Sequence, residues 1–229
     1  MTDFLLFVAL PYLSLAVFFL MTILRYRMRP FTYTSLSSQF LENKQHFWSS
    51  VPFHYGILSV FAVHLAAFLL PREILAWNAS PLRLILLEVT GFGMALVTLA
   101  GLFNIVMRRV NHSRARRVTN LTDWILYAFL LVQVVSGMCV AILHGWGSSW
   151  FSTSASPWIW SLLSLQPDAS YVSAMPWLVK LHFVNAFLIF GIFPFTRLVH
   201  VLVVPNPYLW RRPQVVLWNR DRKKVRSAD

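Results

Sequence analysis

Residues 51–70 read VPFHYGILSVFAVHLAAFLL and contain no Asp, Glu, Lys or Arg. A helix needs about 20 apolar residues to cross a hydrocarbon core about 30 Å thick, so this stretch has the length of one crossing. Pro71 follows it and favours a helix end there, because proline cannot continue a helix well. The stretch therefore predicts a transmembrane helix that carries two histidines, His54 and His64.

Similar apolar runs occupy the rest of the chain. The 229 residues are 57% hydrophobic and only 12% charged, which is too apolar for a soluble domain of this size. The alternating pattern of an outer-membrane barrel is absent. We therefore expect an all-α integral membrane protein, a single domain over residues 1–229 without internal repeats. Its predicted spans are residues 4–24, 51–70, 84–107, 123–143 and 177–204.

The basic residues indicate the topology. Lys and Arg concentrate after the first span, after the third span and in the tail, 205–229, whereas the alternate connections hold almost none. By the positive-inside rule, the N-terminus lies outside and the C-terminus lies in the cytoplasm after five crossings. The first run continues past the length of a signal peptide and is expected to stay as an anchor. The net charge of +12 thus reflects topology, and no nucleic-acid partner is expected.

The few thiols and carboxylates exclude several metal centres. Cys139 is the only cysteine, which excludes a disulfide framework, a thiolate zinc site, an iron–sulfur cluster and a covalently attached haem. Glu88 is the only acidic residue well inside a span, so a di-iron carboxylate site is not expected either.

Histidines inside a span are functional candidates, because polar groups are costly there. His54 and His64 are ten residues apart, roughly 15 Å along an ideal helix, and face directions about 80° apart. His182 and His200 are eighteen residues apart, roughly 27 Å on one face of an ideal helix. Because spans 2 and 5 run in opposite directions, His54 pairs with His200 near the cytoplasmic side.

By the same reasoning, His64 on span 2 pairs with His182 on span 5 nearer the outer side. One histidine on each side of a flat macrocycle is the axial ligand set of a haem, so we predict two haems b in the bundle of spans 2 to 5. The unequal separations require tilt and a kink at Pro194. The other histidines are weaker candidates: His46 and His112 lie in polar connections, and His144, at the end of span 4, is an alternative to His182.

These motifs resemble a known family. The segments 53–58, 63–64, 180–182 and 193–200, together with residues 37–39 and the basic loop from Arg108, are similar to the gamma subunit of membrane-bound respiratory nitrate reductase. The resemblance covers most of the chain. It implies a di-haem cytochrome b in the cytoplasmic membrane of a prokaryote, which oxidises a membrane quinol near the outer face and passes the electrons inward.

The resemblance also implies partners and site residues. The electron acceptors would be an iron–sulfur beta subunit and then a molybdenum-containing alpha subunit on the cytoplasmic side. His54 and His200 would ligate the inner haem, and His64 and His182 the outer haem, beside which quinol binds. The family has a basic residue at the start of span 3, and the nearest position here is Arg83.

Other charged residues allow two readings each. Glu88 either accepts a quinol proton or is a carboxyl paired with Arg83 or solvated. Arg108 and Arg109 either bind propionates of the inner haem or only mark the topology. Arg197 is the better propionate candidate, because a buried guanidinium needs an anion. The basic tail either docks to a peripheral subunit, which we favour, or contacts anionic lipid, or only fixes topology.

Two rival functions remain at this level. A haem-b anchor of a related reductase, associated with sulfite reduction or of the heterodisulfide-reductase type, would share the cytochrome motifs. A transporter with a histidine proton relay and no haem belongs to another class, and the paired depths of the histidines argue against it.

Overall fold

The computed structural model of the chain describes residues 1–29, 32 and 44–202, with the backbone alone at 44–46. Every regular element in these ranges is helical, as predicted. Five runs are long and apolar enough to cross a membrane, which confirms the number of spans expected from the sequence. They are α1, η1 and α2 (Thr2–Phe4, Leu5–Ala9, Leu10–Met28), α3 (Lys44–Leu69), α5 (Pro81–Asn111), α7 (Leu121–Leu143) and α11 (Trp177–Ile192).

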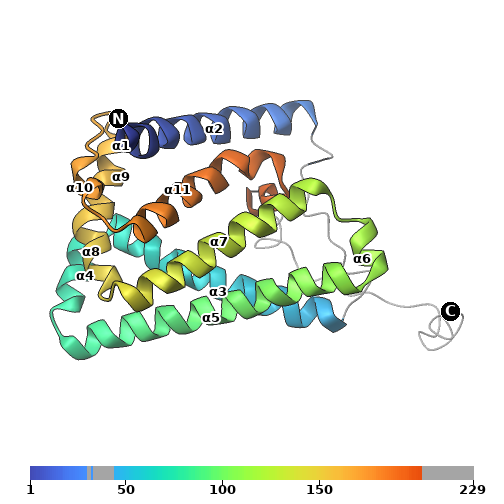
Figure 1. Ribbon diagram of the computed structural model, residues 1–229, viewed down its shortest axis with the longest axis horizontal. Coiled ribbons are helices and arrows are strands. Elements are labelled where there is room, and N and C mark those ends of the chain that lie inside the picture. Colours follow the sequence, from blue (N-terminus) through green and yellow to red (C-terminus); the bar gives the residue numbers. More distant parts are fainter. Residues whose placement is uncertain (30–31, 33–43, 203–229) are drawn as a thin grey trace, which may run out of the picture.

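Short elements gather at the two ends of the bundle (Figure 1). We call one end the α8 end, because α4 (Pro71–Asn78), α8 (Gly147–Trp150), η4 (Phe151–Ala155), α9 (Ser156–Leu163) and α10 (Ser170–Ser173) lie there beside the N-terminus. The opposite end, the α6 end, holds α6 (Ser113–Arg117) and the turns η5 (Phe193–Phe195) and η6 (Arg197–Leu202). Successive long helices therefore alternate in direction, as the predicted topology requires.

Two glycines bring α3 and α5 into close contact. A Cβ atom at Gly101 would lie 2.4 Å from the backbone nitrogen of Phe53, and one at Gly56 would lie 2.7 Å from that of Thr98. Only glycine permits such an approach of two helix backbones. No atom of the described residues lies within 4 Å of a Cβ built at Gly91 or Gly93, so these two glycines do not serve the contact between α3 and α5.

The remaining long helices pack side by side, α5 against α7, α7 against α11 and α11 against α2. The α8 end contains a buried aromatic cluster around Trp158, whose Nε1 donates to the carbonyl of Phe7 at 3.0 Å. A smaller apolar cluster lies toward the α6 end and includes Leu102, Leu126 and Leu130. Burial of these side chains holds α3, α5, α7 and α11 in the order that positions the histidines.

The fifth span departs from the prediction of one kinked helix over residues 177–204. The α-helix ends at Ile192, and the chain continues as the turn η5, an extended Thr196 with φ −110° and ψ 179°, and the six-residue turn η6. Pro194 accounts for the end of the helix, because it lacks the N–H that an α-helix requires. The interruption also accounts for the unequal spacing of the histidines along the two spans, because a straight helix would carry His200 past the depth of His54. Residues 203 and 204 lie outside the described residues.

Candidate functional site

The four histidines of the predicted spans lie in two pairs. His54 on α3 faces His200 in η6, with ring centres 6.2 Å apart and ring planes at 71°. His64 on α3 faces His182 on α11, with ring centres 6.5 Å apart and planes at 37°. The first pair lies toward the α6 end and the second toward the α8 end. The structure therefore brings together the same partners that the spacing predicts, with His182 and not His144 facing His64.

Three of the rings are oriented by backbone carbonyls. Nδ1 of His54 lies 2.7 Å from the carbonyl of Ser50, that of His64 lies 2.8 Å from the carbonyl of Val60, and that of His200 lies 2.7 Å from the carbonyl of Arg197. A ring that donates from Nδ1 has its Nε2 lone pair available for a metal. This is the arrangement by which proteins fix the tautomer of a metal-ligating histidine.

The pair geometry fits a metal held between two imidazoles. Bonds of about 2 Å from one metal atom to a nitrogen of each ring, on opposite sides, place the ring centres about 6 Å apart. Both observed separations agree with that value. Among the described residues, no group of three or more His, Cys, Asp or Glu side chains is arranged to hold a metal ion. Two opposed imidazoles are the axial donor set of a haem, which brings four ligands of its own.

His182 is oriented differently, by side chains of α7. Its Nδ1 lies 3.0 Å from Ser136 Oγ, and its Nε2 lies 3.1 Å from Gln133 Nε2. Gln133 Oε1 in turn accepts from Asn185 Nδ2 at 2.7 Å. A Cβ atom at Gly137 would lie 2.8 Å from His182 Cε1, so the absence of a side chain there makes room for the ring.

The sequence reasoning missed this network around His182. Its one local signal is that Gln133 and Asn185 are amides in the middle of apolar spans, where a polar side chain needs a partner. Which partner each amide finds follows only from the packing of α7 on α11.

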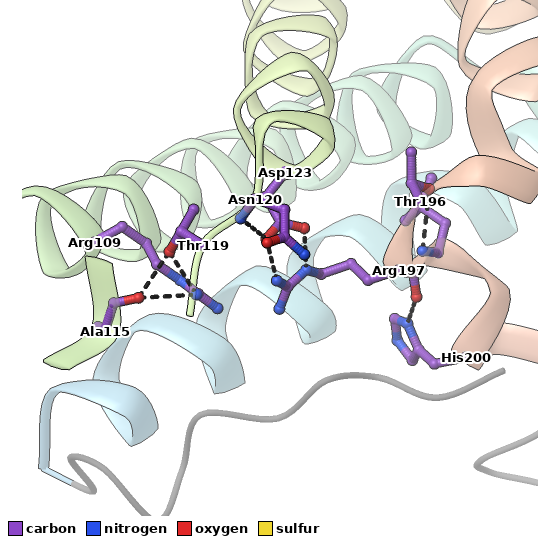
Figure 2. A network of polar contacts seen from close by, with 9 residues as sticks. Arg109, Ala115, Thr119, Asn120, Asp123, Thr196, Arg197 and His200 are labelled. Carbon is purple, nitrogen blue, oxygen red and sulfur yellow. Dashed lines mark hydrogen bonds and ion pairs between the residues drawn. The ribbon is translucent and has the colours of Figure 1, made fainter. Parts of the chain in front are cut away.

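Figure 2 shows a second polar network, at the α6 end. Asp123 and Arg197 form an ion pair with two contacts, in which Nε of Arg197 donates to Oδ1 of Asp123 at 2.7 Å and Nη2 donates to Oδ2. Asp123 also accepts from the backbone N–H of Asn120 at 3.0 Å, within a capping box that begins α7. The anion that burial of Arg197 requires is thus supplied by Asp123, a residue to which the sequence analysis gave no role.

The other propionate candidates lie near this network. Arg108 and Arg109 are both buried at the end of α5. Arg109 donates from Nη1 to Thr119 Oγ1 at 2.8 Å, as Figure 2 shows. His112 follows them, half-buried, whereas the side chain of His46 and the tail 205–229 lie outside the described residues. Two buried guanidinium groups therefore lie at the same end as the His54–His200 pair.

Arg83 and Glu88 lie at the α8 end and are not paired with each other. Arg83 is exposed, donates from Nη2 to the carbonyl of Ala76 at 3.3 Å and has its guanidinium 5.5 Å from the ring centre of Trp77. Oε1 of Glu88 accepts from the backbone N–H and the hydroxyl of Ser148, at 2.8 and 2.7 Å. The partner of Glu88 is therefore the start of α8, a contact that sequence reasoning did not foresee.

The fold and the paired histidines define a multi-pass helical membrane protein with two opposed imidazole pairs. The family model of the nitrate reductase gamma subunit matches residues 3–219, and the chain belongs to this family. The expected resemblance is thereby confirmed.

Curated relatives include nitrate reductase gamma chains. The chain is 32% identical to the respiratory nitrate reductase 2 gamma chain of Escherichia coli (strain K12), over 90% of this chain and 92% of the relative. It is 30% identical to the nitrate reductase gamma chain of Bacillus subtilis (strain 168), over 88% and 92%. It is also 27% identical to the nitrate reductase-like protein NarX of Mycobacterium tuberculosis, over 92% of this chain but 33% of that protein.

Proposed function

We propose that the chain is the membrane-anchoring di-haem cytochrome b subunit of a respiratory nitrate reductase, which oxidises quinol and passes the electrons to a cytoplasmic subunit. The observation that carries the proposal is the presence of two opposed histidine pairs at two depths of one bundle, with ring centres 6.2 and 6.5 Å apart. Membership of the nitrate reductase gamma subunit family supports it. A transporter would not require paired imidazoles at this separation.

We assign His54 and His200 to one haem b and His64 and His182 to the other. A haem b with two imidazole ligands carries one electron at a time, and its potential depends on the ligands and their surroundings. The chain's own residues hold the imidazoles in place, through carbonyls at three of them and through Ser136 at His182. Ligation by Nε2 of His182 would require the amide of Gln133, which lies 3.1 Å from that nitrogen, to turn aside. Arg108 and Arg109 are the proposed partners of the propionates at the α6 end, since Arg197 has Asp123 as its anion.

The charge distribution supports one orientation. Arg114, Arg116 and Arg117 are exposed on α6, and the predicted basic tail follows η6 in the chain. The positive-inside rule therefore places the α6 end in the cytoplasm and the N-terminus outside, in the cytoplasmic membrane of a prokaryote. The His54–His200 pair is then the inner pair, and the His64–His182 pair is the outer pair.

The quinol site is proposed at the outer pair. His64 is exposed on α3, and its ring packs edge-on against Phe151 of η4 with ring centres 5.5 Å apart. An apolar, aromatic surface beside an imidazole suits a quinol ring, and Arg83 and Glu88 are the candidate polar residues at this end. Protons released there leave on the outer side, whereas the electrons cross toward the cytoplasm.

The electron acceptors are proposed on the cytoplasmic side. They are an iron–sulfur beta subunit and a molybdenum-containing alpha subunit, as the names of the relatives and the family imply a multi-subunit reductase. The exposed arginines of α6 carry positive charge that suits an acidic partner, and the sequence after η6 is also basic.

An assay of haem reduction by quinol tests the proposal. Membranes that contain the assembled complex receive a quinol analogue, and the rate at which the haem absorption bands become reduced is recorded for the wild type, His64→Ala and Leu65→Ala. Leu65 is the neighbouring exposed residue on α3 and serves as the matched control. We expect the wild type and Leu65→Ala to be reduced at similar rates and His64→Ala to be slower by about tenfold or more. Equal rates in all three would contradict the proposal.

A further inference from the structure

We propose that the Asp123–Arg197 ion pair positions His200. Asp123 does not contact His200 itself, but the inner haem of the proposed function would depend on its carboxylate through Arg197. This inference rests on the proposed function and goes beyond it, because it assigns a role to Asp123 and a different role to Arg197.

His200 lies on a segment with little structure of its own. It follows the end of α11, the turn η5 and the extended Thr196, and it belongs to a 3₁₀ turn of six residues, Arg197–Leu202. Hydrogen bonds in 3₁₀ turns have poorer geometry than those of an α-helix, and such turns occur only in short pieces. The other three histidines lie on long α-helices. His200 therefore needs support from other elements to hold a fixed position.

Two arginine contacts supply that support. Arg25 of α2 donates from Nη1 to the carbonyls of Pro194 and Thr196, at 2.5 and 3.1 Å, and so holds the segment just before η6. Arg197, the first residue of η6, binds Asp123 on α7 through two nitrogens of its guanidinium. A planar guanidinium bound at two points fixes direction as well as distance. The interrupted segment is thus held from α2 on one side and from α7 on the other.

Asp123 is itself held rigidly. Its side chain is 2% exposed, and it accepts the N–H of Asn120 at the start of α7, where the positive end of the helix dipole favours a carboxylate. The carboxylate therefore has a defined position before Arg197 reaches it.

The connection to the imidazole passes through one residue. The carbonyl of Arg197 accepts the hydrogen bond from Nδ1 of His200 at 2.7 Å, as Figure 2 shows. The side chain of Arg197 thus fixes the same residue whose backbone orients the ring. Loss of the Asp123 carboxylate would leave a buried guanidinium without that anion and release this residue. The expected consequence is local to His200, since His64 and His182 lie on other parts of the bundle.

The chain contains a matched ion pair for comparison. Lys180 lies two residues before His182, and its Nζ is 3.3 Å from Oδ1 of Asp3. Those side chains are 24% and 43% exposed, against 12% and 2% for Arg197 and Asp123, and His182 is oriented by Ser136 on another helix. Partly exposed pairs contribute little, so Asp3→Asn should leave both haems unchanged.

The test counts each haem separately in the purified complex. Optical and electron paramagnetic resonance spectra are recorded for Asp123→Asn, for the uncharged double variant Asp123→Asn with Arg197→Gln, and for Asp3→Asn. Spectra of His200→Ala and His64→Ala assign the signals of the inner and outer haem. The outer haem in each sample reports whether the bundle has folded, and the double variant removes both charges of the ion pair.

We expect the double variant, and Asp123→Asn wherever it folds, to lose the inner haem signal in at least about half of the molecules, or to shift its spectrum and midpoint potential, while the outer haem stays. Asp3→Asn should match the wild type. An inner haem with wild-type occupancy, spectrum and potential in the double variant would overturn the inference, as would equal loss of both haems there. Absence of the two haems from the wild type would instead overturn the proposed function.

Discussion

The two histidine pairs use the same side chains but different supports. At the outer pair, both histidines lie within long helices, and His182 is oriented by Ser136 and Gln133 of the neighbouring α7. At the inner pair, His200 lies beyond the end of α11, on a segment that Arg25 contacts at Pro194 and Asp123 contacts at Arg197. A ligand on a regular helix needs only its neighbours to fit, whereas a ligand on a short turn needs the turn itself to be held. The inner pair should therefore be sensitive to distant charged residues, and the outer pair to local packing.

The helix that the pairs share gives the largest expected effect. Gly101→Ala places a Cβ 2.4 Å from the backbone nitrogen of Phe53, so α3 and α5 must move apart. Because α3 carries both His54 and His64, both haems should be lost together, with a destabilisation of about 1–3 kcal/mol. Haem content after heating measures the effect. Gly93→Ala is the control and should behave as the wild type, because the described part of the chain has no atom within 4 Å of the new Cβ.

A substitution beside His182 should separate the two pairs. In Gly137→Val, the new side chain meets a ring whose Cε1 lies 2.8 Å from the position of Cβ. We expect the outer haem to be lost and the inner haem to be kept, because His54 and His200 are at the other end of the bundle. Reduced-minus-oxidised spectra give the haem content. Gly91→Val, which faces open space, should keep both haems, and loss of the inner haem in Gly137→Val would contradict the distinction between the pairs.

A milder change sharpens the same comparison. Ser136→Ala removes the oxygen that lies 3.0 Å from Nδ1 of His182 and accepts the N–H of the ring when Nε2 binds a metal. Loss of a partner of a metal-bound histidine weakens binding about tenfold at the low end of the usual range. The outer haem should therefore transfer to an excess of apomyoglobin faster than in the wild type. The transfer rate of the inner haem should not change. Transfer of both haems at the wild-type rates would show that Ser136 has no orienting role.

The smallest effect is expected outside the bundle, at Asp168. The hydroxyl and backbone N–H of Ser170 bind its carboxylate and hold the pKa of Asp168 below its ordinary value. A lowered pKa in the folded state means that the charged form stabilises the fold above the unfolded pKa of about 3.9, and that this contribution is lost as the pH falls through the folded value. Asp168→Ala should lower the melting temperature slightly at pH 7, and the difference should shrink below pH 4. A difference that grows toward low pH would contradict the assignment.

The sequence predicted the features that depend on local periodicity. The apolar runs gave five spans, although the helices extend beyond them, with α5 covering Pro81–Asn111 instead of residues 84–107. The spacing of the histidines gave both pairs, because the alternating direction of the helices fixes which depths face each other. The interruption after Ile192 was anticipated only as a kink, since Pro194 marks where a helix weakens but not how far the chain turns.

The supports of the site depend on contacts between residues far apart in the chain. Asp123 and Arg197 are separated by 74 positions, and Glu88 and Ser148 by 60. Each residue alone has a bland interpretation, Asp123 as a helix cap and Glu88 as an interfacial carboxyl. Only the packing of α7 beside η6, and of α8 beside α5, selects the partner. Single-sequence reasoning contains no information about that packing.

The most direct test of the account is a dithionite-reduced minus oxidised optical spectrum with haem quantification on the purified protein, repeated for His64→Ala and His200→Ala. If each haem is held by one pair of imidazoles, removal of one histidine should abolish the haem of that pair and leave the other haem in place. The account predicts about two haems b per chain in the wild type and about one in each variant, with different spectra for the two that remain. No haem in the wild type, or no loss in the variants, would contradict it.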